Sequence, residues 1–133
     1  MLLTPGPTAL PPSVREAMSE ELINPDVDPD FADRYDALLD KLGTAFDTDD
    51  EMVVMGGEGI LGLEAAIAST VAPGDQVLCL SNGPYGDGFA DFVESYGGEV
   101  TLVDADYDDP LPMAALERTL AAGDFDLATM VHC

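Results

Sequence analysis

Apolar and amphipathic segments alternate from residue 51 to residue 133. The apolar segments predict four strands: residues 52–55, 76–82, 99–106 and 126–133. Between them, apolar side chains recur every three or four residues, which predicts three helices: residues 60–71, 89–96 and 113–120. Strands and helices that alternate in this way form a parallel sheet with helical crossovers. The sequence therefore predicts an α/β fold built on a mostly parallel sheet.

Residues 1–50 follow a different pattern. Three prolines in the first eleven residues predict an extended or turning start, and Ser13 is expected to cap a short helix after Pro12. Apolar side chains spaced by three and four over residues 31–46 predict an amphipathic helix. We therefore divide the chain into an N-terminal extended segment with its helix, residues 1–50, and the first part of an α/β domain, residues 51–133.

The charge balance is strongly acidic. Aspartate and glutamate outnumber lysine and arginine by 27 to 4, for a formal net charge of −23. Nucleic acid and anionic membranes would be repelled, so neither is expected as a partner. Apolar residues make up 47% of the chain, which is enough to build a core, so the acidity does not indicate disorder. Two interpretations remain: a protein of a salt-rich cytoplasm, where ions screen the repulsion, and an acidic module that binds a basic partner.

Neither a membrane span nor a metal site is expected. No segment approaches the ~18–20 apolar residues of a span, and the N-terminus lacks the basic and apolar regions of a secretory signal. The expected location is therefore the cytoplasm. Cys79 and Cys133 are expected to be buried free thiols, and His132 is the single histidine. A zinc site would need more ligands than this.

The segment Gly56–Gly57–Glu58–Gly59 lies between a predicted strand and a predicted helix. Backbone N–H groups at a helix N-terminus point outward, and glycines let an anion approach them. The segment fits neither the dinucleotide fingerprint nor the nucleotide P-loop. Two interpretations stay open: a phosphate-binding loop and a plain glycine turn.

A second loop, residues 81–86, follows the next strand with the sequence Ser-Asn-Gly-Pro-Tyr-Gly. It places Tyr85 near the start of a helix. Ligands bind at the carboxyl ends of strands in such sheets, and a rigid aromatic ring there can stack on a flat group. The alternative is a tyrosine that belongs to the core or to the turn.

Five segments, in their order and spacing, give the chain a likeness to a known family. They are LLTPGPTALPPSV at 2–14, GGEGILGLEAA at 56–66, PGDQVLCLSNGPYGDGF at 73–89, YGGEV at 96–100 and MVHC at 130–133. With them the chain resembles the first third of a class V pyridoxal-phosphate aminotransferase, of the alanine–glyoxylate or serine–pyruvate type. The acidity adds a resemblance to haloarchaeal proteins. The fold implied is the N-terminal part of the type I aminotransferase large domain, a mostly parallel sheet with helices on both faces, here truncated.

The resemblance also implies roles for particular residues. The segment Gly57, Glu58, Gly59 and Ile60 would bind the phosphate of pyridoxal phosphate, and Tyr85 would stack on its ring. Gly6 would lie near the substrate. The complete enzyme would be a homodimer that moves an amino group from a small amino acid (alanine, serine or aspartate) to a 2-oxo acid (glyoxylate or pyruvate).

Two positions depart from the family pattern. The family commonly has Ser or Thr at the position of Glu58, and Thr or His at that of Ile60. Both changes remove a side-chain donor from the phosphate, and neither removes the backbone N–H groups. Because a carboxylate and a phosphate repel each other, we expect Glu58 to turn aside or to pair with a cation. An acid placed favourably in the first turn of a helix is the simpler interpretation.

The catalytic lysine is also missing. Enzymes of this family hold the cofactor through a Schiff-base lysine that lies beyond the strand predicted at 126–133. The single lysine here, Lys41, is expected on the surface of the amphipathic helix. No catalytic residue is therefore assigned, and the chain is interpreted as an N-terminal fragment that is inactive alone. The alternatives are a fragment of a lyase or desulfurase of the same fold, and a non-catalytic acidic binding module.

Overall fold

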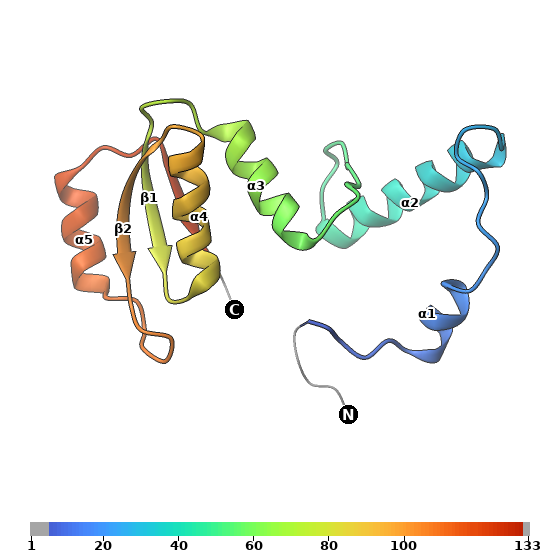
Figure 1. Ribbon diagram of the computed structural model, residues 1–133, viewed down its shortest axis with the longest axis horizontal. Coiled ribbons are helices and arrows are strands. Elements are labelled where there is room, and N and C mark those ends of the chain that lie inside the picture. Colours follow the sequence, from blue (N-terminus) through green and yellow to red (C-terminus); the bar gives the residue numbers. More distant parts are fainter. Residues whose placement is uncertain (1–5, 132–133) are drawn as a thin grey trace. The chain divides into compact units, whose positions relative to one another are not determined.

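The computed structural model describes residues 6–131 of the chain. The chain divides into two compact units, and the boundary in the sequence falls between Val54 and Met55. Figure 1 shows both units, which we describe separately. Among the described residues, helices are the regular structure of the N-terminal unit, and the sheet lies in the C-terminal unit.

The N-terminal unit holds helices α1 (Pro12–Ala17) and α2 (Asp30–Phe46). The prediction that Ser13 caps α1 is wrong, because the helix already begins at Pro12 and no side chain caps it. Proline lacks an N–H group and has a fixed φ, so it suits the first helical position. The amphipathic helix α2 is confirmed. On α2 the rings of Phe31 and Tyr35 stack with their centroids 5.8 Å apart.

The strand predicted at residues 52–55 is absent from the described structure, where this segment is irregular. Val53 is 76% exposed and Met55 is 43% exposed. A strand is held by hydrogen bonds to a neighbouring strand, and no described segment pairs with residues 52–55. The prediction of a buried strand here is therefore wrong for the described structure, because an apolar pattern alone does not supply a partner strand.

The C-terminal unit is built on three parallel strands in the order β2-β1-β3. The strands are β1 (Gln76–Ser81), β2 (Glu99–Asp104) and β3 (Leu127–Met130). Gln76 fixes their register at the amino ends: its side chain donates to Glu99 Oε2 at 2.7 Å, and its backbone N–H donates to Asp126 Oδ2 at 2.8 Å. The predicted parallel arrangement of these strands is confirmed.

Three helices accompany the sheet: α3 (Gly59–Thr70), α4 (Pro84–Ser95) and α5 (Met113–Ala122). Helix α4 packs on the sheet, and Figure 1 shows α5 on the opposite side of the strands. The α/β fold with helices on both faces is therefore confirmed. Helix α4 begins five residues earlier than its apolar spacing alone predicted, at Pro84. It ends before Gly97, whose φ of 87° is one that side chains rarely adopt.

The core lies between α3, α4 and β1. Its fully buried members are Ile67, Val77, Cys79 and Val93. Cys79 is a buried free thiol, as predicted, whereas Cys133 and His132 lie outside the described residues. Desolvation raises the pKa of the Cys79 thiol. The Thr129 hydroxyl lowers this pKa, and the charge of Glu94 raises it further. No helix in residues 6–131 is long and apolar enough to cross a membrane.

Candidate functional site

The glycine loop at residues 56–59 leads directly into α3, which begins at Gly59. Glu58 is the N-cap residue, with extended φ and ψ of −74° and 161°. Its carbonyl oxygen accepts a hydrogen bond from the Leu61 N–H at 3.0 Å. No side chain caps this helix, so the N–H groups of Gly59 and Ile60 are left to a ligand or to water. This is the arrangement that an anion needs at a helix N-terminus.

The glycine loop is open on one side. A Cβ atom placed on Gly56 or on Gly59 would meet nothing within 4 Å, whereas one on Gly57 would lie 2.6 Å from Leu61 Cδ2. Gly57 therefore packs beneath a side chain of α3, while its glycine neighbours leave free space beside the helix N-terminus. A phosphate fits such a loop by its chemistry, because the donors are backbone N–H groups and no side chain fills the space.

Glu58 and Ile60 are both exposed at this end of α3. Within the described residues the Glu58 carboxylate makes no hydrogen bond or ion pair, so the cationic partner considered for it is not found there. Ile60 is 41% exposed and offers no donor. Since neither Glu58 nor Ile60 offers a side-chain donor, any anion bound here would be held by backbone N–H groups.

The second loop is tied to β1 by the last residue of that strand. The buried Ser81 Oγ lies 2.7 Å from Asp87 Oδ1 and 2.9 Å from the Gly83 carbonyl oxygen, and it accepts the Gly83 N–H at 3.2 Å. Gly86 lies against the same serine, since a Cβ atom placed on it would be 2.5 Å from Ser81 Oγ and 2.7 Å from Ser81 Cα. Position 86 therefore requires glycine for space.

Tyr85 projects from the second position of α4, at the carboxyl end of β1. Its side chain is 56% exposed, so the interpretation as a core residue is wrong. Pro84 precedes it at the first helical position. An exposed ring on a rigid helix start fits a stacking role, because a flat ligand can cover its open face.

Tyr107 is a neighbour of this loop that the sequence analysis missed. A Cβ atom placed on Gly83 would lie 2.9 Å from Tyr107 Cε1, so the ring rests directly against the Gly83 backbone. Tyr107 follows β2, whose carboxyl end lies beside that of β1. The signal that could have found it is an aromatic residue just after a strand, at the same sheet edge as Tyr85.

The predicted site residues lie on separate elements of the chain. Figure 1 shows the first turn of α3 set apart from the start of α4. The two helices meet farther along, where Tyr96 Oη donates to Glu64 Oε1 at 3.1 Å. Gly6 is exposed and belongs to the N-terminal unit, and Lys41 is exposed on α2, as predicted.

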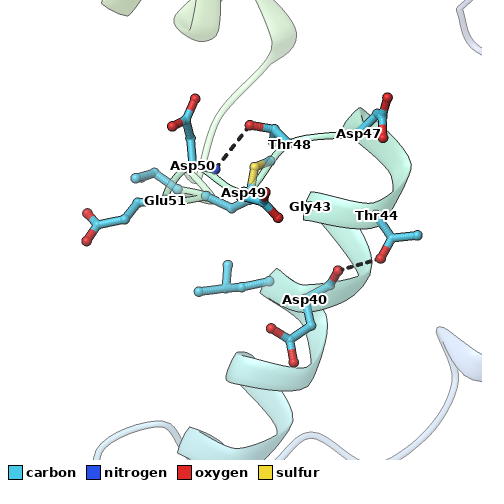
Figure 2. A pocket seen from close by; sticks show the side chains of 11 residues that line it. Asp40, Gly43, Thr44, Asp47, Thr48, Asp49, Asp50 and Glu51 are labelled. Carbon is cyan, nitrogen blue, oxygen red and sulfur yellow. Dashed lines mark hydrogen bonds between the residues drawn. The ribbon is translucent and has the colours of Figure 1, made fainter.

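Acidic side chains surround a hollow at the end of α2 and the segment that follows it (Figure 2). They are Asp40, Asp47, Asp49, Asp50 and Glu51. Thr48 Oγ1 accepts the Asp50 N–H at 3.1 Å and so shapes the turn among them. Residues 6–131 contain no group of three or more ligands arranged to hold a metal ion. The hollow presents an acidic surface.

Comparison with known proteins agrees with this architecture. No family model matches the chain. The chain is 30% identical over 133 residues to an uncharacterised aminotransferase of Methanocaldococcus jannaschii, and the match covers 99% of this chain and 34% of that protein. It is 31% identical over 131 residues to the pyridoxamine–pyruvate transaminase of Mesorhizobium japonicum, with 98% of this chain and 33% of that protein covered.

A solved structure shows the same likeness in three dimensions. The ureidoglycine–glyoxylate aminotransferase of Bacillus subtilis superposes with a TM-score of 0.83 at 26% identity, over 97% of this chain and 33% of that one. The chain is similar to the N-terminal third of class V pyridoxal-phosphate aminotransferases. It spans about a third of the length of the curated relatives that it matches.

Proposed function

We propose that residues 1–133 form the N-terminal third of an enzyme that moves an amino group from a small amino acid to a 2-oxo acid. Alanine, serine or aspartate would be the donor, and glyoxylate or pyruvate the acceptor. The names of the relatives support this range of acceptors, because one acts on pyruvate and another on glyoxylate. The complete enzyme would be a cytoplasmic homodimer.

The observation that carries the proposal is the uncapped, open N-terminus of α3. Pyridoxal phosphate has a phosphate dianion, which the N–H groups of Gly59 and Ile60 would bind with help from the helix dipole. Gly59 would let the phosphate approach the backbone, Gly57 would pack beneath Leu61, and Glu58 would point away from the phosphate. These four residues fit the phosphate by their backbone chemistry alone.

Tyr85 would hold the other part of the cofactor. Its ring is rigid, because Pro84 and the Ser81 hydrogen bonds fix the start of α4. Stacked on the pyridine ring, Tyr85 would orient the cofactor and shield one face from water. Gly6 would approach from the N-terminal segment on the substrate side. When bound, the cofactor supplies an electron sink for the amino-group transfer.

The lysine that completes such a site would come from the two thirds of the enzyme that the chain does not span. Lys41 is exposed on α2 and is not a candidate. The residues described here would thus bind and orient the cofactor, and the proton transfers would depend on groups elsewhere in the complete enzyme.

A spectroscopic and product assay tests the proposal. The full-length protein is incubated with pyridoxal phosphate and with alanine, serine or aspartate, and glyoxylate or pyruvate is then added. We expect cofactor-dependent formation of glycine from glyoxylate or of alanine from pyruvate. Elimination from serine, or sulfur release from cysteine added in a parallel sample, would instead identify a lyase or desulfurase. Failure to bind the cofactor would leave a non-catalytic acidic module.

A further inference from the structure

We propose that Tyr107 is a positioning residue, which holds the Tyr85 loop in place through Gly83. The inference rests on the proposed function, because it concerns the loop that would present Tyr85 to the cofactor. Tyr107 comes from a different crossover connection than Tyr85, so the contact joins two loops at the carboxyl edge of the sheet.

The two loops start from neighbouring, hydrogen-bonded strands. Ser81 at the end of β1 is paired with Asp104 at the end of β2. The pairing extends one residue further, because the Ala105 N–H donates to the Ser81 carbonyl oxygen at 2.9 Å. Tyr107 follows two residues later. The sheet therefore fixes the place from which the Tyr107 ring reaches Gly83.

The absence of a side chain at Gly83 leaves room for this ring. Its φ and ψ of 161° and −178° are extended, a conformation that other residues adopt without strain. A Cβ atom at this position, however, would lie 2.9, 3.3 and 3.6 Å from three carbons of the Tyr107 ring. The glycine thus allows the ring to press on the backbone at the N-cap of α4.

Gly83 is held from a second side as well. Its N–H donates to Ser81 Oγ, and its carbonyl oxygen accepts the Asp87 N–H at 3.1 Å. Between these bonds and the Tyr107 ring, the N-cap of α4 has little freedom, and Tyr85 follows it after the rigid Pro84. Tyr107 itself is 75% exposed, and its hydroxyl makes no hydrogen bond among residues 6–131. Its effect therefore comes from the ring and not from the hydroxyl.

Hydrogen exchange of the full-length protein without cofactor tests the contact, with mass spectrometry of the peptide that covers residues 82–87. Tyr107→Ala should speed exchange of this peptide by about three- to tenfold, the scale of a lost aromatic contact. Tyr107→Phe keeps the ring and is the matched control, with wild-type exchange expected. Gly83→Ala should loosen the same peptide, because its methyl group displaces the ring.

The double variant separates a shared contact from two independent effects. If Gly83 acts through Tyr107, the pair of Gly83→Ala and Tyr107→Ala should exchange no faster than the single variants. Effects that simply multiply would overturn the proposal, as would wild-type exchange in Tyr107→Ala. Tyr107 is exposed, so its variants are expected to fold, and their melting temperatures verify this.

Titration of pyridoxal phosphate into the same variants connects the contact to the site. Tyr107→Ala should weaken cofactor affinity by about three- to tenfold, and Tyr107→Phe should not. Unchanged affinity in Tyr107→Ala, where Tyr85→Ala does weaken binding, would overturn the positioning role. If Tyr85→Ala also leaves affinity unchanged, the proposed function fails, and the exchange data alone then decide whether Tyr107 holds the loop.

Discussion

The glycine loop before α3 and the Tyr85 loop before α4 use the same residue type for opposite purposes. At Gly56 and Gly59, a missing side chain leaves open space beside a helix N-terminus. At Gly83 and Gly86, it lets other residues pack onto the backbone. One loop is accessible and the other is fixed. Glycine before a helix thus leaves room for a ligand only when its neighbourhood is empty.

The largest expected effect is that of a methyl group added to the Tyr85 loop, compared with a methyl group added to the glycine loop. Gly86→Ala should destabilise the protein by about 3 kcal/mol, because the new atom would overlap the Ser81 backbone, which cannot move aside. Gly59→Ala should leave the free energy of unfolding within about 1 kcal/mol of wild type, since its Cβ meets open space. Urea unfolding measures both. Equal losses for the two variants would remove the distinction between the loops.

Tyr85 tests whether the fixed loop serves binding. In the full-length enzyme, Tyr85→Ala should weaken cofactor retention by about 1–3 kcal/mol, through the lost stacking and burial. Tyr85→Phe should cost little, because the ring is kept. Stability should barely change in either variant, since the side chain is 56% exposed. A titration of the apo-enzyme that gives wild-type affinity for the alanine variant would exclude stacking.

Salt tests how far charge repulsion limits the stability of the protein. Packing in the Tyr85 loop should not depend on salt in this way. With a net charge of −23 and acids gathered around the α2 hollow, the folded form should become more stable as salt rises from ~0.1 M to molar levels. Each ~1 kcal/mol gained should raise the melting temperature by about 4 °C or more. A melting temperature that stays flat across this range would count against adaptation to high salt.

The contact between α3 and α4 should depend on pH at the alkaline end. The hydrogen bond to Glu64, with smaller contributions from burial and the Glu64 charge, raises the pKa of Tyr96 above its usual 10.0. The folded state therefore prefers the neutral phenol, so this stabilisation is complete below pH 10 and is lost as the pH rises through the folded-state pKa. Tyr96→Phe should lose part of the alkaline decline in stability. An identical pH profile in both proteins would show that the bond contributes nothing.

The smallest effect is expected at Glu58. Since its carboxylate contacts no cation among the described residues, Glu58→Ser should leave cofactor affinity unchanged or improve it slightly. Glu58→Gln, which removes the charge and keeps the size, is the control. A tenfold loss of affinity in the serine variant would reveal a positive role for the carboxylate at the open loop.

Local pattern predicted most of the fold and rather less of the site. The alternation of apolar strands with helical spacing is a property of nearby residues, and it correctly gave β1, β2 and β3. The segment at residues 52–55 has the same pattern but lacks a neighbouring strand in the described structure. The prediction that Ser13 caps α1 is wrong because the helix already begins at Pro12. The Tyr107 contact escaped prediction because it depends on two loops that only the sheet brings together.

The order β2-β1-β3 also has a consequence for synthesis on the ribosome. Gln76 is separated from its β2 partner Glu99 by 23 positions in the sequence and from Asp126, which directly precedes β3, by 50. Contacts between residues close in sequence form faster, because less loop entropy is lost. The β1-α4-β2 unit should therefore assemble cotranslationally as soon as β2 leaves the exit tunnel. Until β3 emerges, the other edge of β1 stays open, and this nascent intermediate is the stage at which the chain is most exposed to chaperones and to misassembly.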